Sequence, residues 1–151
     1  MLKERVVRAT AGFMLSAMVI SGAGVVAAAA PAAAADRDCT TTFRWAKGNQ
    51  NGKATYVLVP SYGSSTTFCN LSPGDSGGDV WALQDALKRC YGRNIAVDGV
   101  FGDATKGALE YAQRAEGIAD DGYYGRETRK SLKWPRRWTA DYAYTGTCIR
   151  L

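Results

Sequence analysis

The sequence predicts a mainly α fold, in which three helices form a bundle, a small disulfide-tied β-hairpin extension precedes them and an extended C-terminal tail follows. Two observations predict this fold. The pattern I-A-x-D-G-x-[FY]-G-x-x-T occurs over residues 95–105 and again over 118–128, each time leading into a polar run that can begin a helix. Apolar side chains also recur at helical spacing over residues 80–90, ahead of the first copy.

The Asp-Gly pair in each copy predicts a tight turn, because glycine tolerates positive φ and aspartate can accept a hydrogen bond from its own backbone. The simplest interpretation of both copies is structural, with Asp98 and Asp121 capping the turns and Phe101 and Tyr124 filling the core. Two turn-then-helix units in tandem predict local pseudo-symmetry. They are too few, and too closely spaced, for a solenoid.

The three helices are expected at residues 77–90, 103–115 and 126–133. The first carries the apolar stripe. The second begins with an acidic first turn, which suits the helix dipole, and ends at Gly117. The third is stopped by Pro135, because proline cannot continue a helix.

Four motifs follow one another between residues 77 and 134: V-x-x-L-Q-x-x-L, V-D-G-x-F-G, T-x-x-A-[VL] and D-G-x-x-G-x-x-T-x-x-x-L. In this order and with these gaps, they resemble the bacterial peptidoglycan-binding module, a three-helix domain found attached to cell-wall hydrolases and also free-standing. The matching residues are Val80, Leu83, Gln84, Leu87, Val97 to Gly102, Thr105, Ala108, Leu109, Gln113, Asp121, Gly122, Gly125, Thr128 and Leu132.

The resemblance implies a three-helix module over residues 75–135 that binds peptidoglycan, through the glycan, the stem peptide or both. The chain departs from the family at one position. The family usually has an aromatic residue immediately before the glutamine of the second helix, and that position here is Ala112, with Tyr111 one residue earlier. We therefore expect the local packing, or the groove that it borders, to differ.

Residues 1–35 read as a secretory signal peptide, with a basic start, an uncharged stretch rich in small apolar residues and an A-x-A cleavage site at Ala33–Ala35. The apolar stretch is long enough for a membrane anchor, but its Ala and Gly content favours removal. Cleavage takes away three basic residues and one acidic residue, so the formal net charge falls from +5 to +3. The mature protein is expected to be extracellular or associated with the cell wall.

The segments on either side of the module lie outside the resemblance. Residues 36–74 form a small β-rich extension, with strands expected at 40–45 and 55–60 and a short third one at 66–70, because these stretches are rich in Thr, Val and aromatic residues. Residues 136–151 are expected to be a tail packed on the module. A lone hairpin is marginal in water, so the extension should pack on the helices or depend on a disulfide.

Cys39, Cys69, Cys90 and Cys148 are an even set in an exported chain, which favours two disulfides. The sequence allows three pairings. We favour Cys39 with Cys69, closing the extension, and Cys90 with Cys148, fastening the tail to the end of the first helix. A zinc site fits poorly, because the cysteines are widely spaced and the chain has no histidine. No metal and no cofactor is expected.

The lack of histidine excludes Ser-His-Asp and Cys-His nucleophiles and histidine-ligated zinc centres in this chain. The remaining possibility is hydrolysis by carboxylates, which needs two acidic side chains on opposite sides of a substrate cleft. The candidates by residue type are Glu110, Glu116, Asp120, Asp121 and Glu127, which we expect to be solvated or capping residues. Nucleic-acid binding has little support, because residues 39–74 carry no basic cluster with interleaved aromatics. Arg136 and Arg137 form a short basic spot that could meet an acidic polymer.

The leading hypothesis is a secreted, non-catalytic module that binds peptidoglycan. Once the signal is removed, we expect no attachment to the membrane. One alternative is a secreted protein-interaction domain, an inhibitor or a hydrolase partner, that uses the β-rich extension. Another is a small carboxylate-dependent wall hydrolase. The residues predicted to line the ligand groove are Trp81, Gln84, Asp98, Phe101, Asp121 and Tyr124.

Overall fold

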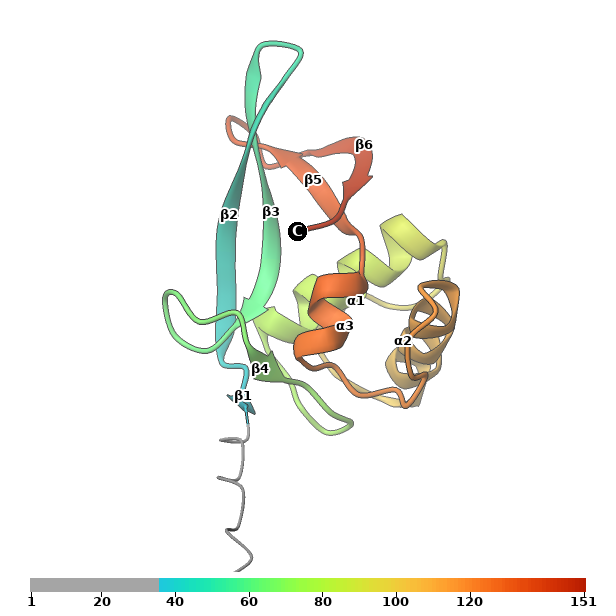
Figure 1. Cartoon of the computed structure of the whole chain (residues 1–151). Coiled ribbons are helices and arrows are strands. Elements are labelled where there is room, and N and C mark those ends of the chain that lie inside the picture. The colour runs from blue at the N-terminus through green and yellow to red at the C-terminus, as the bar shows by residue number, and fades with distance from the viewer. Residues whose placement is uncertain (1–35) are drawn as a thin grey trace, which may run out of the picture. The chain divides into compact units, whose positions relative to one another are not determined.

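The computed structural model describes residues 36–151, so the predicted signal peptide and its cleavage site lie outside the described residues. No helix within this range is both long enough and apolar enough to cross a membrane. The elements in chain order (Figure 1) are β1 (Arg37–Asp38), β2 (Thr41–Gln50), β3 (Lys53–Ser61), β4 (Cys69–Asn70), α1 (Gly78–Tyr91), α2 (Asp103–Ala115), α3 (Arg126–Ser131), β5 (Trp134–Trp138) and β6 (Tyr144–Ile149).

Strands β2, β3, β5 and β6 form one antiparallel sheet in that spatial order, so the prediction of a mainly α fold was wrong. The expected extended tail is in fact the β5–β6 hairpin. It joins the sheet where β5 pairs with β3, with Thr55 opposite Trp138 and Tyr56 opposite Arg137. The tail is rich in Trp, Tyr and Thr, which favour strands, but its partner strand lies far away in the sequence.

Strands β2 and β3, which form a hairpin, are longer than the strands expected from the sequence at residues 40–45 and 55–60. Its two-residue turn is Asn51-Gly52, where both residues have positive φ, of 51° and 76°. Such a turn matches the twist of the flanking strands, which explains the long ladder from Thr41 opposite Ser61 to Gln50 opposite Lys53. The short strand β4 pairs in parallel with β1 in a separate two-stranded sheet.

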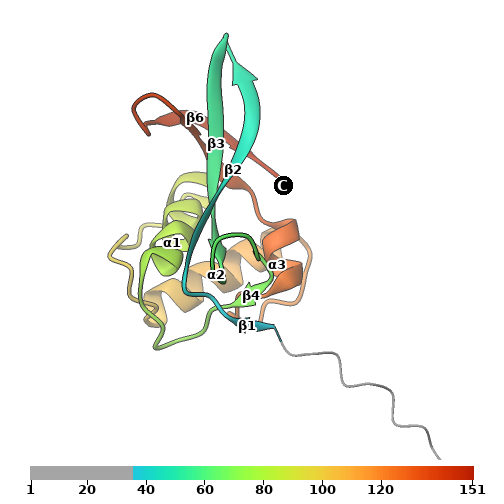
Figure 2. The same cartoon turned by 90° about the vertical axis from the view of Figure 1, so that its left-hand side faces the viewer.

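The three helices lie close to their expected positions, but they do not form a bundle of their own. Helix α3 has six residues and ends at Ser131. Helix α1 contacts β3 and β5 as well as α2, so it lies at the junction of the helices and the sheet. Figure 2 shows the same arrangement from the side of the β2–β3 hairpin. The molecule is therefore a mixed fold with a helix shared between two layers.

One apolar cluster joins both layers. Val57 and Val59 of β3, Leu83 and Leu87 of α1, and Trp134 of β5 are all 0% exposed and belong to it. Each fully buried side chain of this kind contributes roughly 1.5–3 kcal/mol relative to exposure. The β-rich extension and the helices therefore depend on the same core.

Covalent and ionic links reinforce these contacts. The disulfides are Cys39–Cys69 and Cys90–Cys148, which confirms both favoured pairings. The second one joins β6 to the C-terminal end of α1. Asp85 on α1 also pairs with Arg137 on β5 at 2.6 Å, and both side chains are almost fully buried. Arg137 is thus part of the interior and not an exposed basic spot.

Candidate functional site

Each Asp-Gly turn is built around one buried glutamine. Gln84, on α1, accepts a hydrogen bond at Oε1 from the Gly99 N–H at 2.8 Å. Its Nε2 lies 2.9 Å from Asp98 Oδ1, 2.9 Å from the Val100 carbonyl and 3.0 Å from Thr105 Oγ1. The side chain is 1% exposed, so these bonds satisfy an amide that would be costly to bury alone. Gln84 thus fastens the turn to α1.

The second turn repeats this arrangement with Gln113, on α2. Its Oε1 accepts the Gly122 N–H at 2.9 Å. Its Nε2 lies 2.9 Å from Asp121 Oδ1, 2.9 Å from the Tyr123 carbonyl and 3.1 Å from Thr128 Oγ1. The pseudo-symmetry expected from the two repeats therefore extends to the hydrogen bonds. The repeat does not predict the equivalence of the two glutamines, because they are 29 residues apart whereas the turns are 23 residues apart.

Three of the six residues predicted to line a groove are buried. Gln84, Phe101 and Tyr124 are each 1% exposed, and Phe101 and Tyr124 belong to the apolar core. Trp81 is half-buried, with Arg137 Cζ 5.3 Å from its ring centroid, so it packs toward β5. The structure brings Gln84, Asp98 and Phe101 to the first turn and Asp121 and Tyr124 to the second. It does not gather all six on one surface.

The two aspartates are exposed at the turns and cap them. Asp98 Oδ1 accepts the Val100 N–H at 2.9 Å, and Asp121 Oδ1 accepts the Tyr123 N–H at 2.9 Å. The hydrogen bond from the Val100 N–H, followed by that from Gln84, lowers the pKa of Asp98 below its ordinary value. Both carboxylates therefore have a structural use.

A groove lies beside the second turn, and we call it the second-turn groove. It encloses about 400 Å³ and is lined by Asn70, Leu71, Ser72, Asp121, Tyr123, Tyr124, Gly125, Arg126, Glu127 and Thr128. Leu71 and Tyr124 exchange two backbone hydrogen bonds of 3.0 Å, which hold the chain after β4 against the turn. Residues 70–72 thus complete a groove that the repeat alone does not form.

The groove offers an aromatic face and polar groups of both signs. Tyr123 is 53% exposed, Glu127 is exposed, and Arg126 forms an ion pair with Asp36 at 2.8 Å. An exposed tyrosine ring can stack on the CH-rich face of a sugar, while charged and amide groups can bind hydroxyl groups or peptide. Tyr123 occupies the variable position after Asp-Gly in the repeat, and its counterpart Val100 is also exposed. Aligning the two copies would have revealed this position.

Four of the five carboxylates that could serve catalysis are held by other groups. Lys106 pairs with Glu110, Arg114 with Asp120 and Arg150 with Glu116, while Asp121 caps its turn. A general acid requires a raised pKa. Burial raises the pKa of Asp79, whose Oδ1 accepts the Val80 N–H at 2.9 Å, but Asp79 lies on α1 and does not line the groove. The groove thus presents binding groups more clearly than a pair of catalytic acids.

The family departure at Ala112 also has a structural counterpart. Ala112 is 0% exposed and belongs to the core, whereas Tyr111 is 42% exposed. Arg93 lies over the Tyr111 ring, with Cζ 3.6 Å from the centroid. The aromatic side chain is therefore on the surface of α2, away from the position that the family pattern gives it.

Comparisons with known proteins bear on the segment that contains both turns. Residues 76–132 match the family described as "Putative peptidoglycan binding domain". The N-acetylmuramoyl-L-alanine amidase CwlL of Bacillus licheniformis is 32% identical over 93 residues, an alignment that covers 58% of this chain and 25% of the amidase. The chain thus spans about a quarter of the length of that relative.

Two solved structures are also similar. The crystal structure of the SleB N-terminal domain is 37% identical with a TM-score of 0.41, over 43% of this chain and 89% of that one. A peptidoglycan-binding protein from Clostridioides difficile, solved with glutamine hydroxamate, is 29% identical with a TM-score of 0.42, over 56% of this chain and 53% of that one. The family match confirms the resemblance seen in the sequence, and residues 76–132 are a module of the putative peptidoglycan binding domain family.

Proposed function

We propose that this protein is an exported, non-catalytic module that binds cell-wall peptidoglycan in the second-turn groove. The observation that carries the proposal is the family match over residues 76–132, which contain both glutamine-centred turns and most of the groove. The exposed Tyr123 ring and the polar groups around it suit a polymer of sugars and peptides. The two disulfides fit an oxidising compartment outside the cytoplasm.

The test is co-sedimentation of residues 36–151 with insoluble peptidoglycan sacculi. We expect the protein to pellet with the sacculi, and Tyr123→Ala to weaken binding about tenfold, because an aromatic contact at the centre of an interface is worth more than about 1 kcal/mol. Tyr111→Ala is the matched control, since that tyrosine is exposed on α2 and does not line the groove. Protein that stays in the supernatant over a range of pH and salt contradicts the proposal.

The absence of catalysis needs its own measurement. We expect purified protein to release no dye from labelled sacculi, because most candidate carboxylates are held in ion pairs or in a turn. Glu127, exposed in the groove, is the acid to examine. Dye release that rises with protein concentration and disappears in Glu127→Gln would make the protein a hydrolase.

A further inference from the structure

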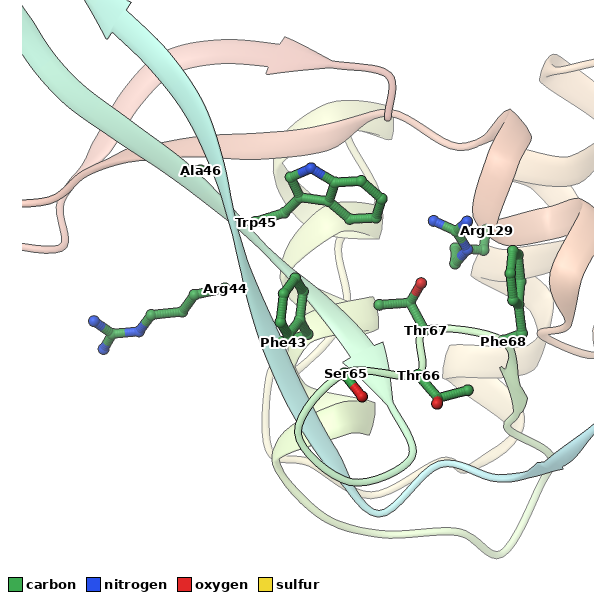
Figure 3. A pocket seen from close by; sticks show the side chains of 9 residues that line it. All are labelled: Phe43, Arg44, Trp45, Ala46, Ser65, Thr66, Thr67, Phe68 and Arg129. Atoms are coloured by element: carbon green, nitrogen blue, oxygen red, sulfur yellow. The ribbon is translucent and has the colours of Figure 1, made fainter.

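A second pocket lies on the β-rich extension, apart from the Asp-Gly turns. It encloses about 700 Å³ between β2, the loop before β4 and α3 (Figure 3). We call it the arginine pocket after Arg129, the only lining residue that falls within the matched segment 76–132. Its walls are therefore supplied mainly by the part of the chain that the family does not explain.

Aromatic side chains form the walls of the arginine pocket. Phe43 and Trp45 lie on one face of β2, because alternate residues of a strand share a face, and their rings meet edge to face with centroids 6.1 Å apart. Phe68 lies beside Arg129 (Figure 3). Arg44 points away, and its Cζ lies 4.7 Å from the Tyr142 ring on the other face. The pocket is thus apolar except for Arg129 and the hydroxyl groups of its loop.

Arg129 is the unusual group in this pocket. It is 6% exposed, and its Nε and Nη1 atoms are buried without a hydrogen-bond partner. Its Cζ lies 4.6 Å from the Phe68 ring centroid and 5.7 Å from that of Trp45. Aromatic faces stabilise a cation only in part, whereas a buried guanidinium without an anion is costly. These two N–H groups are therefore unsatisfied within the fold, and a ligand would reach them by entering the pocket that Arg129 lines.

Two further cations, Lys47 and Arg136, lie next to the lining residue Trp45 or to each other, and no carboxylate within residues 36–151 forms an ion pair with either. Lys47 Nζ lies 4.9 Å from the Trp45 ring, and Arg136 donates from Nη2 to the Lys47 carbonyl at 2.5 Å. Within residues 36–151, neither of these cations nor Arg129 forms an ion pair, whereas Arg126 and Arg137 both do. Burial lowers the pKa of Lys47, and the charges of Arg129 and Arg136 lower it further. The arginine pocket thus carries an unbalanced positive charge.

We propose that the arginine pocket binds a carboxylate that is carried next to a small apolar group, and that the stem peptide of peptidoglycan supplies it. The planar guanidinium donates two parallel N–H groups to a carboxylate, and the aromatic walls accept a methyl or methylene group beside it. The identity of this ligand rests on the proposed function. The pocket itself is separate from the second-turn groove, so the two sites are tested separately.

The experiment measures binding of a synthetic stem pentapeptide, L-Ala-γ-D-Glu-L-Lys-D-Ala-D-Ala, to residues 36–151 by calorimetry. We expect Arg129→Gln to weaken binding at least tenfold and Arg129→Lys to recover only part of the loss, because lysine lacks the planar fork. Arg114→Gln, at an exposed ion pair on α2, is the control and should bind normally. Equal affinity of wild type and Arg129→Gln overturns the proposal.

Further measurements compare the wild-type protein with Arg129→Gln. Amidation of the peptide carboxyl groups should weaken binding as much as Arg129→Gln does, and should change little in that variant. Unchanged binding of the amidated peptide, or complete competition by inorganic phosphate at equal concentration, overturns the choice of a carboxylate. Thermal unfolding adds a readout of a structural role: Arg129→Gln should keep or raise the melting temperature, since it removes a buried unpaired charge.

The sacculi assay separates this proposal from the proposed function. Wild-type protein that binds sacculi while Arg129→Gln binds the pentapeptide normally overturns only the arginine pocket. Protein that binds the pentapeptide through Arg129 but ignores sacculi overturns the proposed function, and with it the assignment of the ligand to the wall.

Discussion

Gly99 and Gly122 occupy equivalent positions in the two turns, with φ of 76° and 72°, but their surroundings differ. A Cβ atom on Gly99 would lie 2.9 Å from the Gly77 carbonyl oxygen, which is backbone. On Gly122 it would lie 2.7 Å from Lys106 Cγ, which belongs to a flexible side chain. The first turn should therefore tolerate a side chain less well than the second.

We predict that Gly99→Ala lowers the free energy of unfolding by about 3 kcal/mol and Gly122→Ala by about 1–2 kcal/mol, because both place a Cβ at positive φ but only the first also clashes with backbone. Gly107, exposed inside α2 with open space around it, is the control, and Gly107→Ala should stabilise by about 0.5–1 kcal/mol. Urea unfolding measures all three. Equal losses at the two turns would contradict the structure.

For single residues, the sequence predicted the turns well but not which of the neighbouring side chains are exposed. Asp-Gly pairs act locally, so Asp98 and Asp121 could be assigned as caps from the chain alone. Whether Phe101 or Tyr124 faces solvent depends on which distant segment covers it, and both turned out to be core residues. The exposure of Tyr123 could have been predicted, because the equivalent position in the first copy of the repeat is Val100, a side chain of different character.

Among the elements, α1 is joined to the sheet by one buried ion pair. We predict that Arg137→Met lowers the free energy of unfolding by about 3–5 kcal/mol, because it leaves the Asp85 carboxylate buried with only the partly exposed Arg89 as its partner. The double variant Asp85→Leu, Arg137→Met should recover most of the loss, since no charge is then buried. A double variant as unstable as the sum of the two single changes would show that packing, and not charge, dominates here.

A second contact joins the C-terminal end of the chain to the end of α2, and it should respond to acid. Burial would raise the pKa of Glu116, but hydrogen bonds from Arg150 and Tyr91 outweigh that effect, so the pKa lies below its ordinary value. The folded state therefore favours the ionised form. This contribution is fully present above the unfolded pKa of about 4.5 and is lost as pH falls through the lower, folded value.

We predict that Glu116→Gln lowers the free energy of unfolding by about 1–3 kcal/mol at pH 7, as for other hydrogen bonds to charged groups. The difference from wild type should shrink as pH falls below 4.5. Denaturant unfolding over pH 2–7 measures it. Glu110→Gln is the control, because that carboxylate pairs only with Lys106 on the surface of α2. A difference in the free energy of unfolding that does not change with pH would show that Glu116 does not contribute to the loss of stability in acid.

The positions of the helices could be predicted from the sequence, whereas the sheet could not. Apolar spacing and the turn residues are local signals, and they place α1 and α2 to within a residue or so. Strand β5 directly follows the short α3, and Pro135, which as a local signal predicts only the end of a helix, lies inside this strand. Its pairing with β3 joins segments some 80 residues apart, and no local pattern encodes that register.

For the whole molecule, the shared core has a practical result. Val57 and Val59 of β3 lie in the same apolar cluster as Leu83 and Leu87 of α1, so deletion of residues 36–73 would remove part of the core. Such a deletion disturbs the fold itself, so it cannot distinguish binding to the cell wall from binding to a partner protein. Point substitutions in the second-turn groove and in the arginine pocket can distinguish them, because they leave the core in place.

We predict that residues 36–151 unfold in one cooperative transition, because the extension and the helices bury each other. Far-ultraviolet circular dichroism and tryptophan fluorescence should report the same midpoint in urea when both disulfides are intact. Trp134 reports on the core and Trp45 on the arginine pocket. Separate midpoints for the two signals would show two independent units.

Phe68 lines the arginine pocket and also contacts a residue of the second-turn groove. The Cζ atom of Arg126, in the second-turn groove, lies 4.2 Å from the centroid of the Phe68 ring. The Cζ atom of Arg129, in the arginine pocket, lies 4.6 Å from the same centroid. One strand of a polymer that occupies the first surface therefore holds its next segment at high effective concentration beside the second. Under the proposed function, residence time on an intact wall is set by this avidity, and short soluble fragments released by wall turnover compete poorly for the protein.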